Sequence, residues 1–301
     1  RQQVFVCSAV AMAAQPAFAE PEEPELRNPT ITVTERESDA NPYGDPEAPY
    51  RAVRSASGLL TEELLDTPKT ITVITDETLK DLGATSFRDV FRQQTGITLG
   101  TGEGGNAFGD RIFIRGYDAR NDVYVDGIRD PGVGSRETFA VQQIEVLKGP
   151  SSTFGGRGTT GGAVSLVSKT PGKGDWGDAE FTLGSDATRR ATVDLNEQVS
   201  DTFAVRFNGM IHESEVAGRD HVYNDRWGAA LAAEWQPTRS FKAGFDYYHL
   251  STDFLPDWGH PYDSANNEPF DVRRDNFYGV LARDEGETFA DIYTGRIAWA
   301  L

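Results

Sequence analysis

The sequence predicts a small α+β domain followed by antiparallel strands of a transmembrane β-barrel, and three observations support this fold class. Between about Pro68 and Thr170, short strand-like and helix-like segments alternate with many glycines. From about Trp176 onward, segments of roughly ten residues alternate between apolar and polar positions, the length at which a tilted strand crosses a bilayer. Tight turns and long polar connections join these segments, as they do in membrane barrels.

Residues 1–19 have the features of a secretory signal peptide. Residues 4–14 form a short apolar run, and Ala17-Phe18-Ala19 is an A-x-A cleavage pattern. The run is too short for a membrane helix, which needs about 20 apolar residues. Because the chain begins with Arg1, we expect this signal peptide to be partial. The only cysteine, Cys7, lies within it, so we expect no disulfide and no cysteine metal site in the mature protein.

The composition and the motifs argue against several classes of function. The formal net charge is −18, whereas nucleic-acid binding needs clustered Lys and Arg. Gly100, Gly102 and Gly105 have the spacing of a dinucleotide fingerprint, but that fingerprint must open a helix and the residues that follow are strand-like. No Ser-His-Asp or paired-carboxylate arrangement occurs at a suggestive spacing. We therefore expect no enzyme, no cofactor and no metal bound by the protein itself.

Residues 66–171 are expected to form the α+β domain. A helix is predicted after an N-cap at Thr75 or Asp76, ending at Gly83. A second helix is predicted after Ser86, with Asp89 as its capping-box partner. The predicted strands are 69–75, 111–116, 122–127 (which closes on an Asp-Gly turn), 144–148 and 163–168.

Residues 176–301 are expected to form barrel strands at 178–184, 189–199, 202–212, 226–235, 240–248 and 291–301. Trp227 and Trp235 mark the two ends of one segment, as in the aromatic girdles of membrane barrels. Tight turns are predicted at 199–202 and 236–239, and long connections at 213–225 and 251–290; the short connection at 184–188 fits this asymmetry less well. Alternation alone also fits a soluble sandwich. A barrel that encloses a plug has about 22 strands, so these six predict the N-terminal part of a longer protein.

Several stretches resemble a known family. TITVT (30–34) resembles the TonB box of TonB-dependent outer-membrane receptors. IRGYDARNDVYVDGIRD (114–130) and IEVLKGPSSTFGGRGTTGGAVSLVSKTP (144–171) resemble the plug core of that family. DGIRDPGVGSRETF (126–139) and FDYYHLSTDFLPDWGHP (245–261) are most similar to its catecholate siderophore receptors.

This resemblance implies a monomeric receptor in the bacterial outer membrane that takes up a ferric siderophore and is energised by TonB. Residues 20–65 would be a periplasmic arm, residues 66–171 the plug, and residues 176–301 the start of the barrel. The TonB box would add a strand to TonB by β-augmentation, which needs β-forming residues on a free arm. Its residues are Thr30, Ile31, Thr32, Val33 and Thr34.

A ferric catecholate is anionic and aromatic, so its site needs arginines and aromatic faces. The plug residues expected to supply them in or beside apical loops are Phe108, Arg111, Arg115, Tyr117, Arg120, Asn121, Arg129, Arg136 and Phe139. By resemblance, Arg115 and Phe139 lie where related receptors touch their ligand. The alternative for each arginine is a salt bridge to the barrel wall, with Asp194, Glu234 and Asp246 as partners for Arg115. The alternative for Tyr117 and Phe139 is packing.

Other functions remain open at this point. The chelate could instead be a hydroxamate, haem or cobalamin, and the chain could be a soluble exported β-rich binding protein. The connection 251–290 is aromatic and charged, with Phe254, Trp258, His260 and Tyr262, and reads as an outer loop that covers a ligand. A signal transducer of this family would carry an extra domain before the TonB box, for which residues 20–29 give no room.

Overall fold

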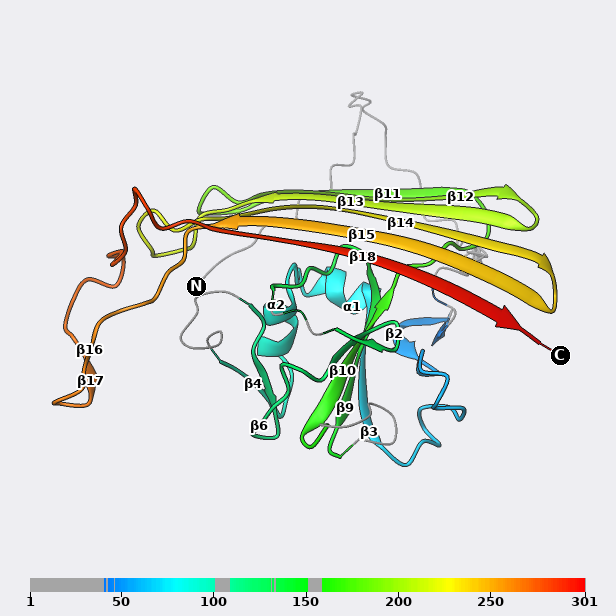
Figure 1. The fold of residues 1–301 in the computed structure, drawn as a ribbon, viewed down its shortest axis with the longest axis horizontal. Helices are drawn as coiled ribbons and strands as arrows, with labels where there is room; N and C mark the ends of the chain where they lie inside the picture. Colours follow the sequence, from blue (N-terminus) through cyan, green and yellow to red (C-terminus); the bar gives the residue numbers. More distant parts are fainter. Residues whose placement is uncertain are drawn as a thin grey trace, which may run out of the picture.

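The computed structural model describes residues 41, 43–45, 47–100, 109–130, 132, 134–150 and 159–300. A long sheet of six strands curves over a small α+β domain, the plug, which lies against the concave face of the sheet (Figure 1). The predicted TonB box, the predicted signal peptide and Phe108 lie outside the described residues.

The plug contains two helices, two sheets and an N-terminal hairpin. The helices are α1 (Asp76–Asp81) and α2 (Phe87–Arg92). The larger sheet has the order β3-β9-β10-β7-β8 and is antiparallel except between β10 and β7. Its strands are β3 (Thr70–Thr75), β7 (Val123–Val125), β8 (Ile128–Arg129), β9 (Val141–Lys148) and β10 (Gly162–Ser168). The smaller sheet is β4 (Ile97–Leu99), β5 (Ile112–Ile114) and β6 (Tyr117–Asp118), and the hairpin is β1 (Gly44–Asp45) with β2 (Ala48–Ala52).

The helix starts confirm the predicted caps. Thr75 accepts a hydrogen bond from the backbone N–H of Thr78 at the start of α1. Ser86 and Asp89 form the complete capping box of α2. Both devices satisfy N–H groups that a helix start leaves unpaired. No helix in the described part of the chain is long and apolar enough to cross a membrane.

One predicted turn is confirmed, and one turn lies where a strand was predicted. Asp126 and Gly127, with φ of 49° and 83°, form the predicted hairpin turn between β7 and β8. The predicted strand 111–116 is wrong at its C-terminal end, because Arg115 and Gly116 have φ of 52° and 84° and form the turn that joins β5 to β6. A left-handed backbone cannot continue a strand.

The large sheet is antiparallel throughout, with the order β11-β12-β13-β14-β15-β18. It confirms the six predicted segments, and its strands are β11 (Trp176–Leu183), β12 (Arg189–Ser200), β13 (Phe203–Glu213), β14 (Asn224–Thr238), β15 (Phe241–Phe254) and β18 (Gly286–Trp299). The predicted long connection 251–290 is shorter than expected, because β15 and β18 stay paired through Ser251–Phe289 and Phe254–Gly286. Polar side chains there do not interrupt a ladder made by backbone groups. The remaining connection holds the small hairpin β16 (Tyr262–Asp263) and β17 (Glu268–Pro269).

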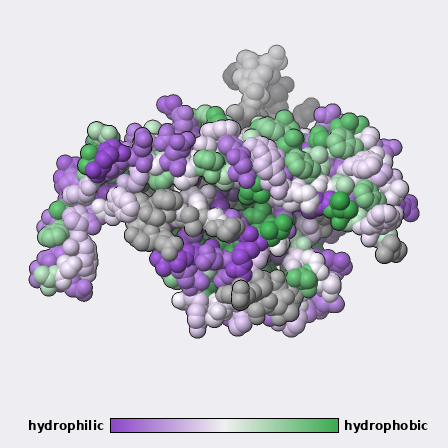
Figure 2. Space-filling view, in the orientation of Figure 1, coloured by the Kyte–Doolittle hydropathy of each residue, from purple (hydrophilic) through white to green (hydrophobic). Residues whose placement is uncertain are grey.

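The two faces of this sheet have the polarity of a membrane wall. On β13 the polar face is buried against the plug, with Arg206 only 2 % exposed, whereas Ile211 on the opposite face is 62 % exposed. Trp227, Leu231 and Trp235 of β14 share that outward apolar face. Hydrophobic surface is visible over the sheet in Figure 2. An apolar outer face with a polar inner face is the arrangement of a strand that separates lipid from an enclosed lumen.

The plug has its own hydrophobic core, between its larger sheet and the helices. Phe87 and Phe91 of α2 pack edge to face against each other, with ring centroids 4.3 Å apart. Both belong to one cluster of buried side chains that also includes Ile112, Ile144 and Val164. The core explains why the plug keeps its shape against a wall that it contacts mainly through polar groups.

Candidate functional site

A cavity of about 740 Å³ lies between the plug helices and the strands β11 to β15. It is at the end of the sheet that carries the longer connections, and we call it the outer cavity. Its plug side includes Arg88 and Arg92 of α2 and Phe139, and its wall side includes Arg190 and His212. The lining is charged on both sides, so the interface between plug and wall is polar at this end.

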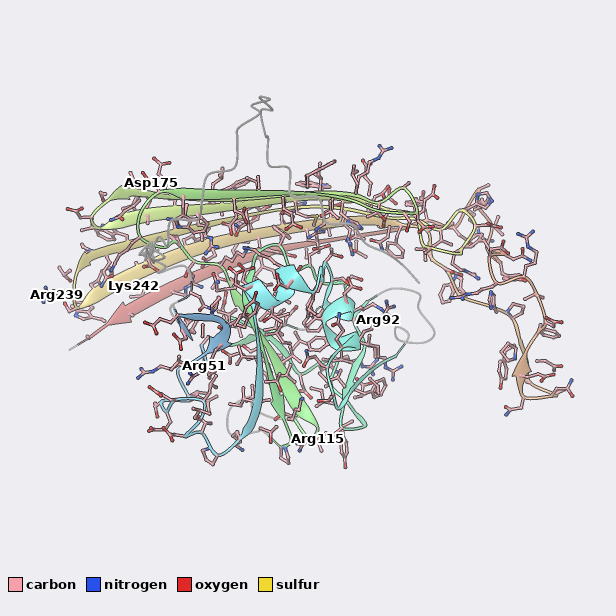
Figure 3. The ribbon with its side chains drawn as sticks, turned by 180° about the vertical axis from the view of Figure 1, so that it is seen from behind. Arg51, Arg92, Arg115, Asp175, Arg239 and Lys242 are labelled. Atoms are coloured by element: carbon pink, nitrogen blue, oxygen red, sulfur yellow. The ribbon has the colours of Figure 1, made fainter. Side chains whose placement is uncertain are left out.

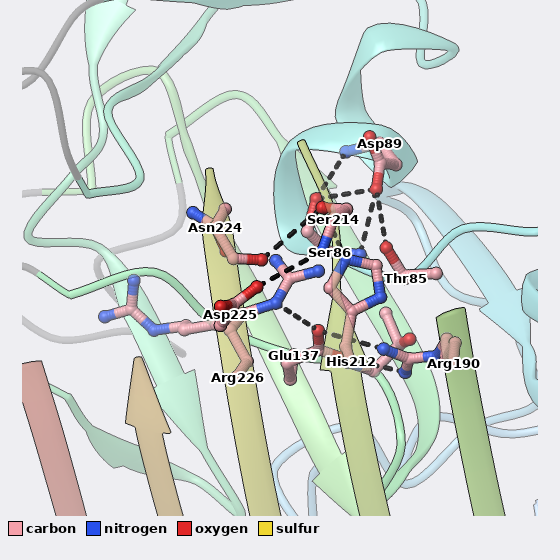
Figure 4. Close-up of polar contacts among 12 residues, drawn as sticks. Thr85, Ser86, Asp89, Glu137, Arg190, His212, Ser214, Asn224, Asp225 and Arg226 are labelled. Carbon is pink, nitrogen blue, oxygen red and sulfur yellow. Dashed lines mark hydrogen bonds and ion pairs between the residues drawn. The ribbon is translucent and has the colours of Figure 1, made fainter. Parts of the chain in front are cut away.

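Glu137 is the central charge of this region (Figure 4). Arg190 of β12 donates to its two carboxylate oxygens from Nη1 and Nη2, at 3.2 and 2.9 Å. Arg226 of β14 lies on the other side, with Nε 3.0 Å from Oε1 as an ion pair. All three side chains are buried. One plug carboxylate therefore links two wall strands.

The loop that carries Glu137 is fixed to the start of α2. Residue 137 forms a β-bridge with Ser86, the N-cap of the helix. Phe87 N donates to the carbonyl of Arg136 at 3.0 Å, and Thr138 Oγ1 donates to the carbonyl of Ala84 at 2.8 Å. These contacts with the start of α2 thus fix the position of the Glu137 carboxylate relative to the wall strands.

Phe139 of the plug packs against the wall rather than standing in an open loop. Its ring stacks on Tyr248 of β15 at 5.6 Å, and it packs in one cluster with Ala140, Met210 and Leu250. The wall makes room for the ring at Gly228 of β14, where a Cβ atom would come within 2.7 Å of it. Phe139 is 7 % exposed and packs against the wall, and it also lines the outer cavity.

Further ionic contacts join the plug to the wall. Lys169, after β10, lies 3.0 Å from Asp194 of β12, which also accepts two hydrogen bonds from Arg206 of β13 at 2.8 and 2.7 Å. Nearer the tight turns, Arg296 of β18 lies 3.5 Å from Asp126 of the plug. These contacts and the Glu137 cluster spread the ionic interface along the strands.

Arg136 is buried inside the plug beside the outer cavity. It is 2.8 Å from Asp130 and 3.6 Å from Asp110, and its backbone N–H donates to Asp110 at 2.8 Å. Burial raises the pKa of Asp110 to about 6, although the charge of Arg136 acts in the opposite direction. This carboxyl belongs to the segment that precedes β5 and lines the outer cavity.

The predicted ligand arginines pair with aspartates of the plug. Arg111 donates twice to Asp118, at 3.2 and 3.1 Å, and Arg120 lies 3.5 Å from the same carboxylate. Arg129 contacts Asp122 at 3.1 Å and the hydroxyl of Tyr124 at 2.6 Å. These arginines thus pair with plug aspartates within ten residues in the sequence, whereas the alternative to ligand binding was a salt bridge to the barrel wall.

The remaining predicted residues lie away from the described wall. Arg115 is exposed at the end of the plug farthest from the large sheet (Figure 3). Tyr117, beside it on β6, is 57 % exposed, and Asn121 is exposed as well. The three wall carboxylates considered for Arg115 have other partners: Asp194 pairs with Lys169 and Arg206, Glu234 with Lys242, and Asp246 with Arg296.

Sequence reasoning missed the charged and polar wall residues that face the plug. Arg190, Arg206, Arg226 and His212 all occupy lumen-facing positions of the strands. The strict alternation placed three of these on the polar face, which is the signal that could have identified them. Glu137 gave no such signal, because nothing local distinguishes it from other acidic residues of the plug.

The longer connections are held together by Arg219. Its guanidinium donates to both oxygens of Asp257 at 2.6 and 2.7 Å, linking the β13–β14 connection to the one after β15. Trp258 and Tyr262 of the predicted covering loop are exposed, whereas Phe254 is buried at the end of β15. Asp257 lines the outer cavity, so this loop forms one rim of it.

Within the described residues, no group of three or more His, Cys, Asp or Glu side chains is arranged to hold a metal ion. The charged groups around the outer cavity instead pair with one another across the interface, as at Glu137. These paired charges dock the plug on the wall.

Comparison with known proteins identifies both parts of the chain. Residues 63–163 match the family described as TonB-dependent receptor plug domain. The probable TonB-dependent siderophore receptor PiuA of Acinetobacter baumannii is 36 % identical over 93 % of this chain and 37 % of its own length. The catecholate siderophore receptor Fiu of Escherichia coli K12 is 37 % identical over 77 % of this chain and 32 % of its own length.

Solved structures give the same result for the fold. The closed-form crystal structure of the ferric-catecholate import receptor Fiu from E. coli K12 superposes with a TM-score of 0.77, at 36 % identity, over 83 % of this chain and 37 % of that one. The chain thus spans about a third of the length of the relatives it matches. Residues 63–163 thus match the plug domain of TonB-dependent receptors, and the chain as a whole is similar to these outer-membrane receptors over their plug domain and six strands of their barrel wall.

Proposed function

We propose that the full-length protein takes up a ferric siderophore of the catecholate type across the outer membrane, energised by TonB. The observation that carries this proposal is a plug with its own hydrophobic core that contacts the lumen side of the wall through ion pairs at several points, besides the packing of Phe139. Water can replace charged partners when such an interface separates, whereas it cannot replace an apolar core. A plug that must move for each transported ligand needs that kind of contact.

The named relatives support the choice of ligand, since PiuA is described as a probable siderophore receptor and Fiu as a catecholate siderophore receptor. The exposed Arg115 and Tyr117 lie on the side of the plug that the described wall leaves free, and they supply a cation and an aromatic face. We propose these two as ligand contacts, with Asn121 beside them. For Arg111, Arg120, Arg129 and Arg136, ligand binding would compete with the aspartates that now hold them. Phe108 is proposed as an aromatic residue in or beside the expected apical loops of the plug.

The ligand class is tested with the full-length receptor in outer-membrane vesicles. Ferric catecholates and ferric hydroxamates are titrated, and quenching of Trp fluorescence is followed. Saturable binding of the catecholate alone supports the proposal. If the hydroxamate binds instead, the protein is still a siderophore receptor but its ligand class is different. If neither chelate binds, uptake of these two siderophore classes is rejected.

The role of TonB is tested by deleting residues 30–34. We expect siderophore binding to be unchanged and uptake of radiolabelled iron to stop, because the box would transmit force and not contact the ligand. Replacing these residues with another β-forming sequence is the matched control, since β-augmentation depends mainly on backbone hydrogen bonds. Uptake that survives the deletion would reject energisation through this segment.

A further inference from the structure

A second cavity, of about 490 Å³, lies between the plug and the ends of β14, β15 and β18 that carry the tight turns. We call it the inner cavity. It is lined by the N-terminal arm segment (residues 43–45 and 47–59), by the face of the plug sheet opposite the hydrophobic core, and by the lumen side of the wall. Ala56 and Gly58 of the arm segment, Ala163 of β10, and Lys242 and Arg296 of the wall are among these residues.

The arm segment covers this cavity from the side of the tight turns. Figure 3 shows Arg51, on the β1–β2 hairpin, on the same side of the molecule as Arg239 and Lys242 at the β14–β15 turn. The hairpin is closed onto the following residues by Val53 N, which donates to the carbonyl of Tyr43 at 2.9 Å. The part of the predicted arm from Asn41 onward therefore packs on the plug rather than extending from it.

A buried carboxylate holds the arm segment in place. Glu145 lies in the middle of β9, between Val73 of β3 and Ser165 of β10, and is 0 % exposed. Its Oε2 accepts a hydrogen bond from Ser55 Oγ at 2.5 Å, and its Oε1 accepts one from Ala56 N at 2.6 Å. Within the described residues, no Lys or Arg forms an ion pair with it. The arm segment thus supplies two of the hydrogen bonds that offset the free-energy cost of burying the Glu145 carboxylate.

A second contact extends the same attachment toward the N-terminus. Gln143 Nε2 donates to Glu145 Oε1 at 2.8 Å, and Gln143 Oε1 accepts from Asn41 Nδ2 at 3.3 Å. Gln143 is itself fully buried. Asn41 is therefore connected to Glu145 through one side chain, and it lies shortly after the predicted TonB box in the sequence.

These contacts would break before the plug sheet does. A pull on the chain before Asn41 loads a few side-chain contacts one after another. The next element, β3, is held to β9 by a ladder that runs from Thr70–Lys148 to Thr75–Gln143, whose backbone bonds share the load. Contacts that break singly resist less force than a ladder that must break together.

We propose that Glu145 is a latch, and that the arm segment is a releasable cover of the inner cavity. When the arm is withdrawn, Ser55 and Ala56 leave the carboxylate, water replaces them, and the inner cavity opens toward the tight-turn side. The ligand then leaves between the face of the plug sheet that carries Glu145 and strands β14, β15 and β18. This inference rests on the proposed function for its cause of opening, but the latch itself can be tested without siderophore or TonB.

The test uses the full-length receptor in detergent, with Ala163→Cys as the only cysteine. Ala163 is 4 % exposed and lines the inner cavity, so a bulky hydrophilic maleimide reports opening. Glu145→Gln keeps the shape but removes an oxygen that accepts from the arm. We expect labelling to be about tenfold faster, since a bond to a charged group is worth about 1.5–3 kcal/mol and 1.4 kcal/mol is tenfold. Ser55→Ala, which leaves β9 unchanged, should act in the same direction.

Tyr50→Phe is the matched control, because it removes a 2.8 Å bond from the same arm segment to Asp81, outside the inner cavity. It should leave the labelling rate unchanged. A cysteine at Val90, which is fully buried in the plug core and lines neither cavity, reports unfolding. If Glu145→Gln exposes this cysteine too, the labelling rate of Ser55→Ala decides between a latch and unfolding. Labelling in both latch variants at the rate of the unmodified receptor would overturn the latch. Absence of siderophore binding would reject the proposed function and leave this result standing.

Discussion

Glu137 of the plug and Arg190 of strand β12 are 53 residues apart and form an ion pair with two hydrogen bonds, of 3.2 and 2.9 Å, inside the plug–wall interface. Arg226 completes the cluster from β14. The sheet that these arginines belong to is apolar on its other face, so the charges are confined to the lumen side. The plug is thereby held in a defined position by contacts that water can compete for.

Glu137→Gln should weaken plug docking strongly. Removing one partner of a buried ion pair costs about 3–5 kcal/mol, because Arg190 and Arg226 would stay buried without their counter-charge. Denaturant unfolding of the full-length receptor measures the loss. Arg189→Gln is the matched control, since its pair with Glu213 is 69 % and 66 % exposed and is expected to contribute below about 1 kcal/mol. Equal effects of the two variants would show that Glu137 does not anchor the plug.

Gly228→Ala should disturb the seat of Phe139. The added Cβ would meet the ring at 2.7 Å and the backbone carbonyl of His249 at 3.0 Å, so the strand or the ring must shift. We expect a loss of about 1–3 kcal/mol in the stability of the docked plug, measured by thermal unfolding. Gly295→Ala, on β18, is the control, because nothing lies within 4 Å of its added Cβ. A neutral Gly228→Ala would contradict the tight packing of Phe139.

Because of the buried Asp110 carboxyl, the free energy of unfolding of the plug should fall as the pH rises. Burial raises its folded-state pKa to about 6, above the unfolded value of about 3.9, so the folded state holds the proton more tightly. The resulting advantage is complete below about pH 4 and is lost as the pH rises through about 6, a difference of about 3 kcal/mol. Unfolding of the receptor between pH 4 and pH 7.5 should show this slope, and Asp110→Asn should remove it. A slope that persists in Asp110→Asn would have to come from another group.

Gly162→Ala should prevent the plug from folding correctly. Gly162 begins β10 with φ of 146°, and an added Cβ would lie 2.1 Å from the carbonyl oxygen of Leu147. Neither the backbone angle nor the space admits a side chain, so we expect a loss above about 3 kcal/mol. Protease resistance of the plug in the purified receptor measures it. Gly58→Ala has open space and an ordinary φ, so it should be resistant like the unmodified receptor.

Local signals in the sequence predicted much of the fold. The caps Thr75 and Ser86, the Asp126-Gly127 turn and the six alternating segments were all recognisable, because capping, turn geometry and strand alternation depend on residues close together in the chain. The end of the connection after β15 was misplaced, because polar residues there read as loop while their backbone stays paired. The candidate site was harder. Arg111, Arg120 and Arg129 were expected to contact a ligand or to pair with the barrel wall, and the structure pairs each with an aspartate a few residues away.

The sequence by itself determined that an α+β plug precedes strands with one apolar and one polar face, and its motifs indicated the receptor family. Only the tertiary structure decided which of these residues contact one another. Glu137 with Arg190, Phe139 with Gly228, and Glu145 with Ser55 and Ala56 are pairs of residues far apart in the chain. Each acidic, aromatic or small residue has many possible partners of the right chemistry. The register of the strands and the position of the plug against them select one, and those depend on the whole chain at once.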